Sequence, residues 1–269
     1  SLGVERVVLA RELSKSEIKE IIDRTGVEVE TFVHGAMCSS YSGRCVLSNY
    51  FTNRDANRGG CAQICRWESD LYDKDMNKIE SPTKFTASSK DLMMANRIKE
   101  MIDIGITSLK VEGRMRSNYY VATVINTYRG IIDDYYNNKL SDERLEHYIR
   151  ILNRVANREA TVQFWDKLPS VNEQYYLGRN EVSNQDFLGI VTNYDEENKI
   201  VTITERNYFK TGDKVEVFGP NIETFSFIVP DIYDNDGNKV NVGRHPEEIL
   251  RFKLDKKVYK DDMIRIKID

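Results

Sequence analysis

Short apolar runs in the first half of the chain predict buried strands. Val7–Ala10 is a β-branched run of the kind found in parallel strands that are covered on both faces. Val27–His34 alternates between two faces, and one of these faces carries Glu30 and His34. Ile106–Glu112 is a third run of this type, so we expect three strands before residue 113.

Between and after these runs, apolar residues recur at the spacing of amphipathic helices. The first helix begins at Ser14, which has an acid three residues on for a capping box, and ends at Gly26. We expect three more helices: from Ser88 or Ser89 to Gly105, over residues 117–136 and over 142–157. The polar segment 69–86 predicts a hairpin-like excursion. This order predicts an α/β fold in which residues 1–160 form about three units of a partial TIM-type (β/α) barrel.

The pattern changes after Arg158, where short alternating runs are separated by turn residues. Five runs predict strands: Leu188–Tyr194, Lys199–Thr204, Lys214–Phe218, Phe225–Val229 and Met263–Ile268. Asp236-Gly237 is a hairpin signal. We therefore expect residues 161–269 to contain a linker, near residues 160–186, followed by a small antiparallel β-barrel domain.

Composition limits the class of protein. The 269 residues carry 39 basic and 43 acidic side chains, which gives a formal net charge of −4. This balance excludes a polybasic nucleic-acid coat but leaves room for a local basic patch. No apolar run reaches the roughly eighteen residues of a membrane span and no secretory leader is evident, so we expect a cytoplasmic protein without membrane contact. A partial barrel exposes strand edges, which a partner subunit or a homo-oligomer would cover.

All the cysteines lie within 28 consecutive positions, at Cys38, Cys45, Cys61 and Cys65. Core cysteines would be scattered along the chain, so this clustering indicates a shared ligand. Two disulfides, separate buried thiols, a zinc site and an iron–sulfur cluster are all open interpretations. The spacings Cys-x6-Cys and Cys-x3-Cys differ from the short pairs of most zinc sites, whereas an iron–sulfur cluster accepts uneven spacing. The spacing favours the iron–sulfur cluster.

Positive charge accompanies the cysteines. Between Cys38 and Trp67 there are four arginines and one acid, Asp55; the arginines are Arg44, Arg54, Arg58 and Arg66. Guanidinium groups here would offset the negative charge of metal-bound thiolates, hold an anionic substrate, or brace the loops.

Several motifs resemble those of peptidase family U-32, the collagenase-like proteases. GAMCSSYSGRCVLS, preceded by Glu30 and Phe32, resembles the family signature. NRGGCAQICRW, SLKVEGRMRS, NYFKTGDKVEVFGP and the closing Asp261–Arg265 extend the resemblance over essentially the whole chain. VQFWDKLP departs from it, because many relatives have a Thr-Gly-Phe-type turn there. The resemblance implies an incomplete or distorted TIM-type barrel before a small β-barrel and, since the chain opens with Ser-Leu-Gly, an N-terminally truncated form.

The resemblance also implies a function. Family members include proteins described as proteases, and others that help to hydroxylate RNA or ubiquinone precursors with a 4Fe–4S cluster. The motifs are similar to those of the branch that hydroxylates the wobble uridine of tRNA to 5-hydroxyuridine and uses prephenate. By this resemblance the cluster would be held by Cys38, Cys45, Cys61 and Cys65, with tRNA as partner and prephenate as co-substrate.

Charged side chains on the predicted strands are candidates for substrate binding. Lys110 and Glu112 share one face of an apolar strand, where burial is costly unless a substrate, or an ion pair with Glu30 or Arg11, compensates them. An RNA loop would meet a basic rim and present unstacked bases. The candidate substrate-binding residues are Glu30, His34, Arg44, Arg66, Lys110, Glu112 and Arg114.

Two other functions stay open. A peptidase acting on a peptide substrate would need an activated nucleophile, and His34 lies four residues before Cys38. The chain has neither a His-Glu-x-x-His motif nor a Gly-x-Ser-x-Gly elbow, so catalytic residues stay unassigned. A zinc-stapled scaffold without enzymatic activity is the third hypothesis.

Overall fold

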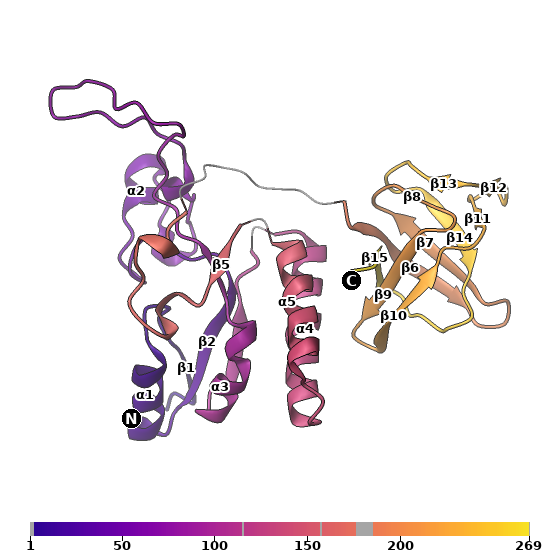
Figure 1. Ribbon diagram of the computed structural model, residues 1–269, viewed down its shortest axis with the longest axis horizontal. Helices are drawn as coiled ribbons and strands as arrows, with labels where there is room; N and C mark the ends of the chain where they lie inside the picture. The colour runs from indigo at the N-terminus through magenta and orange to yellow at the C-terminus, as the bar shows by residue number, and fades with distance from the viewer. Residues whose placement is uncertain (1–2, 115, 157, 176–184, 269) are drawn as a thin grey trace. The chain divides into compact units, whose positions relative to one another are not determined.

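The computed structural model describes residues 3–114, 116–156, 158–175 and 185–268. The chain divides into two compact units (Figure 1). The first contains residues 1–116, 131–145 and 156–182, and the second contains residues 117–130, 146–155 and 183–269. Along the described part of the chain, no helix is long and apolar enough to cross a membrane.

A mixed sheet forms the centre of the first unit. Its strands are β1 (Arg6–Val8), β2 (Glu28–Gly35), β3 (Asp91–Met93), β4 (Ser108–Val111) and β5 (Ala160–Thr161). Strand β2 pairs in parallel with β1 and β4 and antiparallel with β3, which in turn pairs in parallel with β5. This arrangement confirms the α/β class with parallel strands, while closure as part of a TIM-type barrel stays a prediction.

Helix α1 (Lys15–Thr25) follows β1 and matches its prediction. The hydroxyl of Ser14 accepts a bond from the backbone N–H of Glu17, and the Glu17 carboxylate accepts one from the N–H of Ser14, which completes the capping box. Gly26 ends the helix in the left-handed conformation, and its N–H donates to the carbonyl of Ile22.

The helix predicted from Ser88 or Ser89 to Gly105 is wrong in its first half. Residues 91–93 form β3, a short 3-10 turn η3 (Ala95–Arg97) follows, and helix α3 covers only Ile98–Asp103. The β3 backbone is extended because it pairs with the end of β2 on one side and with β5 on the other. These partners lie far away in the sequence, so local periodicity could not reveal them.

Two longer helices lie where the sequence places them. Helix α4 spans Asn118–Tyr136 and helix α5 spans Asp142–Val155. The residues of α4 that are buried recur at helical spacing, including Tyr120, Val124 and Tyr128.

The second unit contains an eight-stranded antiparallel sheet in the order β10-β9-β15-β6-β7-β14-β11-β12, and a two-stranded sheet β13-β8. The bounds are β6 (Phe187–Asp195), β7 (Ile200–Glu205), β8 (Phe209–Lys210), β9 (Lys214–Gly219), β10 (Ile222–Ile228), β11 (Ile232–Tyr233), β12 (Lys239–Val240), β13 (Val242–Gly243), β14 (Ile249–Lys253) and β15 (Met263–Ile266). Each of the five predicted strands overlaps one of these. The Asp236-Gly237 hairpin is confirmed between β11 and β12, where the Asp234 carboxylate accepts bonds from the N–H groups of Asp236 and Asn238.

Residues 158–175 connect the two regions and pack within the first unit. They contain β5 and two 3-10 turns, η4 (Gln163–Trp165) and η5 (Val171–Glu173). Within the VQFWDKLP segment, Trp165 is buried and the Gln163 amide donates to the carbonyl of Lys90. The predicted linker extends into residues 176–184, which lie outside the described residues. The expected domain boundary at residue 160 stays a prediction.

Candidate metal centre

The cysteine segment leaves β2 at the end of the sheet opposite α1 (Figure 1). It contains helix α2 (Leu47–Thr52) and two 3-10 turns, η1 (Ala56–Arg58) and η2 (Ile64–Arg66). Cys38 lies in the loop after β2, Cys45 just before α2, Cys61 between the two turns, and Cys65 inside η2. The hairpin of residues 69–86 follows and projects beyond α2.

Two glycines permit close backbone approaches in this segment. Gly35 has φ of 110°, and a Cβ atom at this position would lie 2.3 Å from the carbonyl oxygen of Glu112. A Cβ atom on Gly60 would lie 2.7 Å from the carbonyl oxygen of Asp55. The end of β2 therefore packs directly on the chain after β4, and the turn before Cys61 is tight, because neither position carries a side chain.

Side chains fasten the loops of the cysteine segment to one another. The Ser48 hydroxyl accepts a bond from the backbone N–H of Ala62, at 3.0 Å. The Asn57 amide donates to the carbonyl of Cys45, at 3.0 Å, and Arg114 donates to the carbonyl of Gly59, at 2.7 Å. These bonds fix loops that no regular secondary structure holds, and they give Arg114 a positioning role.

All four cysteines are free thiols, so the structure contains neither of the two disulfides. The sulfur atoms of Cys38 and Cys61 each accept a hydrogen bond from the backbone N–H two residues on, at 3.4 Å. Partial burial raises the pKa of Cys38, and so do the nearby negative charges of Cys65, Cys45 and Cys61. The four sulfurs are thus close enough to interact electrostatically.

Four thiols on one segment are a soft donor set of the kind that zinc ions and iron–sulfur clusters both accept. Among the described residues, no three His, Cys, Asp or Glu side chains converge on a point where one metal ion would bind. Tetrahedral zinc needs such convergence, with Zn–S bonds of about 2.3 Å. A cluster of several iron atoms is reached by thiolates from different directions, and N–H···S bonds are among the features that tune it. The ligand role of the four cysteines stays a prediction.

The charged residues predicted on β2 and β4 are paired. Lys110 donates to the Glu30 carboxylate at 2.8 Å, and Ser108 donates to the same carboxylate at 2.8 Å. Arg11 lies 3.8 Å from Glu112 and stacks over the ring of Phe32, 3.7 Å from its centroid. The expected ion pairs with Glu30 and Arg11 are therefore confirmed: Glu30 pairs with Lys110, and Arg11 pairs with Glu112.

His34 and Cys38 differ from the nucleophile–base pair of a cysteine peptidase. Burial, together with the smaller effect of the positive charge of Arg116, lowers the pKa of His34 to about 4. The pKa of Cys38 is raised, whereas a catalytic cysteine needs a lowered one. These shifts favour the neutral thiol and the neutral imidazole.

The cysteine segment also carries exposed arginines and aromatic rings. Arg44, Arg54 and Arg58 lie at the surface. Large rings are exposed in the same segment: Tyr41, Tyr50, Phe51 and Trp67. Tyr50 is 82 % exposed, and its ring contacts that of Phe51 edge to face. Exposed rings and arginines on one segment are residue types that suit the stacking of unpaired bases.

The sequence analysis missed Asp91 and Arg158. Asp91 is buried in β3 and lies within ion-pair distance of three arginines: Arg66, Arg116 and Arg158. The sequence predicted a helix at this position, and an acidic residue in an amphipathic helix is expected on its exposed face. The burial of Asp91 was therefore not predicted. The sequence signal that could have indicated a buried charge is the position of Asp91 directly before the apolar residues 92–94.

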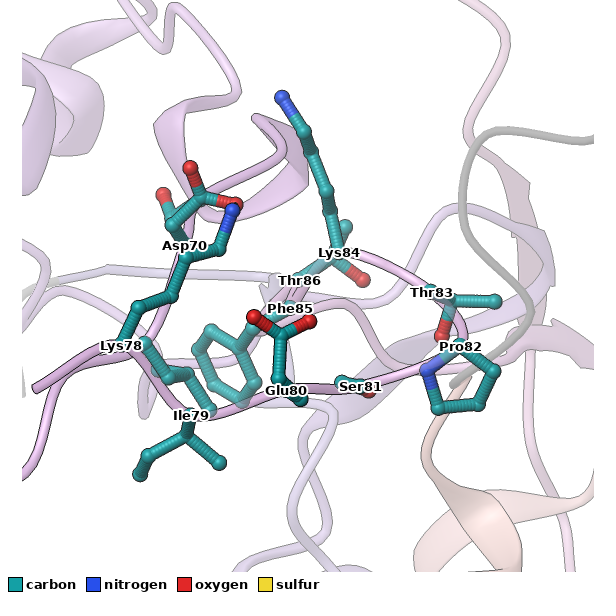
Figure 2. Close-up of a pocket in the computed structure, with 12 residues that line it drawn as sticks. Asp70, Lys78, Ile79, Glu80, Ser81, Pro82, Thr83, Lys84, Phe85 and Thr86 are labelled. Carbon is teal, nitrogen blue, oxygen red and sulfur yellow. The ribbon is translucent and has the colours of Figure 1, made fainter.

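A hollow of about 410 Å³ lies in the hairpin of residues 69–86 (Figure 2). Isolated bridges between Tyr72 and Lys78 and between Ser69 and Phe85 confirm this hairpin. The Phe85 ring and the charged ends of Glu80, Asp70 and Lys78 line the hollow. None of the predicted site residues lines it.

Family models account for both parts of the chain. Peptidase family U32 matches residues 1–175, and the peptidase family U32 C-terminal domain matches residues 183–265. The chain belongs to peptidase family U32. The resemblance inferred from its motifs is thereby confirmed.

The U32 chain is similar to curated proteins named for RNA hydroxylation. It is 47 % identical over 268 residues to tRNA hydroxylation protein P1 of Bacillus subtilis, covering 98 % of this chain and 64 % of that protein. It is 32 % identical over 269 residues to tRNA hydroxylation protein P of Haemophilus influenzae, covering 81 % of this chain and 58 % of that protein. It therefore spans about three fifths of the length of these relatives.

A comparison with solved structures matches about a third of this chain. The matched structure is the C-terminal domain of a Geobacillus thermoleovorans protein described as a U32 peptidase, at 39 % identity and a TM-score of 0.31. The match covers 32 % of this chain and 98 % of that one.

Proposed function

We propose that this U32 chain is part of an RNA-hydroxylating factor that forms 5-hydroxyuridine in tRNA. The observation that carries the proposal is the quartet of free, electrostatically coupled thiols on one segment. The identity of 47 % to a protein named for tRNA hydroxylation supports it, because that similarity covers 98 % of the chain.

In this proposal Cys38, Cys45, Cys61 and Cys65 hold a 4Fe–4S cluster. The cluster would supply the redox chemistry of the reaction, and the protein would supply position and charge. The N–H groups that donate to the sulfurs of Cys38 and Cys61 would stabilise thiolate charge. A small anionic co-substrate such as prephenate would bind to the positive charges beside the cysteines.

Recognition of the tRNA would fall to the exposed face of the cysteine segment. Tyr41, Tyr50 and Trp67 would stack on unpaired bases, while Arg44 and Arg58 would contact phosphates. The ion pairs of Glu30 and Glu112 would keep the strands below this face rigid. A cytoplasmic location is part of the same proposal.

The decisive measurement combines metal and nucleoside analysis. We expect the anaerobically prepared protein to contain about four iron and four sulfide per chain and to absorb near 400 nm. The variants Cys38→Ser and Cys61→Ser should lose the cluster, and 5-hydroxyuridine should fall at least tenfold in tRNA from cells that depend on them. Ser39→Ala, an exposed change in the same loop, should retain both. Stoichiometric zinc without sulfide, with normal 5-hydroxyuridine in the cysteine variants, would contradict the proposal.

Proteolysis remains the alternative that the family name suggests. The raised pKa of Cys38 and the lowered pKa of His34 give a thiol–imidazole mechanism no support. Cleavage of casein or gelatin that disappears in both Cys38→Ser and His34→Gln would favour this alternative.

A further inference from the structure

Strand β2 lies between two parallel neighbours at the edge where the cysteine segment begins. Glu30 of β2 pairs with Val8 of β1 and with Ser108 of β4, so β1 and β4 flank β2 on opposite sides. The carboxyl ends of the three strands reach the same edge of the sheet, which is where ligands bind in α/β folds. Cys38 follows the end of β2 at this edge. The residues that follow β1 and β4 therefore lie on either side of the start of the cysteine segment.

Each of these flanking stretches holds one loop of the cysteine segment. After β1, the Glu12 carboxylate accepts bonds from the backbone N–H and the hydroxyl of Ser42, at 2.8 and 3.1 Å. Ser42 lies between the first two cysteines. After β4, the Arg114 side chain donates to the carbonyl of Gly59, at 2.7 Å, just before the third cysteine. The two halves of the cysteine segment are thus tied to opposite sides of β2.

An ion pair joins these two contacts across β2. Arg11 lies 3.8 Å from Glu112, and its guanidinium stacks over the ring of Phe32 in β2. The Glu112 carboxylate also accepts a bond from the backbone N–H of Arg114, at 3.1 Å. A continuous run of contacts therefore passes over β2, and it is named here the strand-end bridge: Glu12, Arg11, Glu112 and Arg114.

The strand-end bridge also brings positive charge to the first cysteine. The Arg11 side chain is 18 % exposed, whereas the arginines Arg44, Arg54 and Arg58 of the cysteine segment lie at the surface. Burial lowers the pKa of Arg11, while the negative charges of Glu112 and Cys38 raise it. Because solvent and salt screen a partly buried charge less than an exposed one, Arg11 acts on the Cys38 sulfur more strongly than a surface arginine would.

We propose that the strand-end bridge positions the metal centre: it holds the loop of Ser42 and the turn of Gly59 at a fixed separation, and Arg11 supplies positive charge beside Cys38. Its role at a metal centre rests on the proposed function. Groups that surround metal ligands orient them and change metal affinity, and the charge near an iron–sulfur cluster is one of the factors that set its reduction potential. The bridge thus has a mechanical effect that needs no metal and an electrostatic effect that needs the cluster.

Hydrogen exchange of the metal-free full chain tests the mechanical effect. Arg11→Met should speed amide exchange about threefold in residues 39–46 and also in residues 57–63, because it breaks the link between them. Glu112→Gln removes the same ion pair from the other side and should give the same result. Arg11→Lys retains the charge and should restore most of the protection. Arg24→Met, which removes an exposed arginine of α1, should exchange as wild type does.

The reduction potential of the anaerobically loaded chain tests the electrostatic effect. Reduction adds negative charge to a cluster, and a nearby guanidinium stabilises that charge. Arg11→Met should therefore shift the one-electron equilibrium about tenfold toward the oxidised form, which lowers the potential by about 59 mV. Arg11→Lys and Arg24→Met should keep the wild-type potential. A purely structural role would change the iron content of Arg11→Met without this dependence on charge.

Three results would overturn the proposal. Unchanged exchange in both loops of Arg11→Met and Glu112→Gln, or faster exchange in only one loop, would show separate local contacts and no bridge. Equal potentials in wild type and Arg11→Met would exclude the charge effect. A chain that takes up neither iron nor sulfide would overturn the proposed function and the charge effect with it, while exchange in the metal-free chain would still decide whether the bridge holds the two loops.

Discussion

At the scale of single residues, burial decides protonation. His34 lies on β2 with 4 % of its surface exposed, and desolvation lowers its pKa to about 4 from the ordinary 6.5. The folded state therefore binds this proton less readily than the unfolded state does. The stability contributed by the neutral imidazole is complete above pH 6.5 and is lost as the pH falls toward 4.

This shift predicts a pH-dependent stability. Between pH 7.5 and 4.5, wild type should lose about 2 kcal/mol more free energy of unfolding than His34→Gln, which lacks the titrating group. Urea unfolding at the two pH values measures the difference. His147→Gln, on helix α5, is the matched control and should behave as wild type. Equal pH dependence in wild type and His34→Gln would contradict the shift.

At the scale of elements, strand pairing determines which side chains meet. Strands β9 and β15 pair antiparallel, with Glu216 opposite Arg265. Both side chains are buried, and the guanidinium donates to the carboxylate at 2.5 Å and lies over the ring of Phe218. The register of two strands almost fifty residues apart thus creates a buried ion pair in the second unit.

Breaking this pair should be costly. Arg265→Met leaves the Glu216 carboxylate buried without its partner, and we expect a loss of about 3–5 kcal/mol in the free energy of unfolding. The double variant Arg265→Met with Glu216→Leu removes both charges and should recover most of that loss. Chemical denaturation of the three proteins measures it. Equal losses in the single and double variants would show that packing, not charge, accounts for the effect.

The secondary structure of β3 also depends on pairing with a strand that is distant in the sequence. Residues 88–105 carry an apolar spacing that predicts one helix, yet Asp91 and Leu92 pair with Ala160 and Thr161 of β5. Backbone bonds to a distant strand outweigh a weak local preference. The same pairing places Asp91 within ion-pair distance of Arg66, Arg116 and Arg158.

At the scale of the whole molecule, the chain has two compact units, and the four cysteines proposed to hold the iron–sulfur cluster all belong to the first. A ligand that binds only the folded state stabilises the region that holds it. The cysteine segment consists of loops and short turns, so it should gain the most order from such a ligand.

Hydrogen exchange should show this localisation. Loading the chain with iron and sulfide should slow amide exchange at least tenfold between residues 38 and 66, and leave strands β6 and β7 unchanged. Mass spectrometry of peptides from loaded and metal-free protein gives the comparison, and Cys61→Ser serves as the control that cannot load. Equal slowing in the second unit would contradict a cluster confined to the first.

The sequence by itself determined the class of fold, the capped helix α1, helices α4 and α5 and five strands of the second unit, because each depends on spacing and capping within a short window. It also grouped the four cysteines, since their clustering is a property of order along the chain. Only the tertiary structure decided that residues 91–93 form a strand and that Asp91 meets three arginines. These features depend on contacts between residues that are distant in sequence. The free-energy cost of their charges depends on burial, which the composition does not reveal.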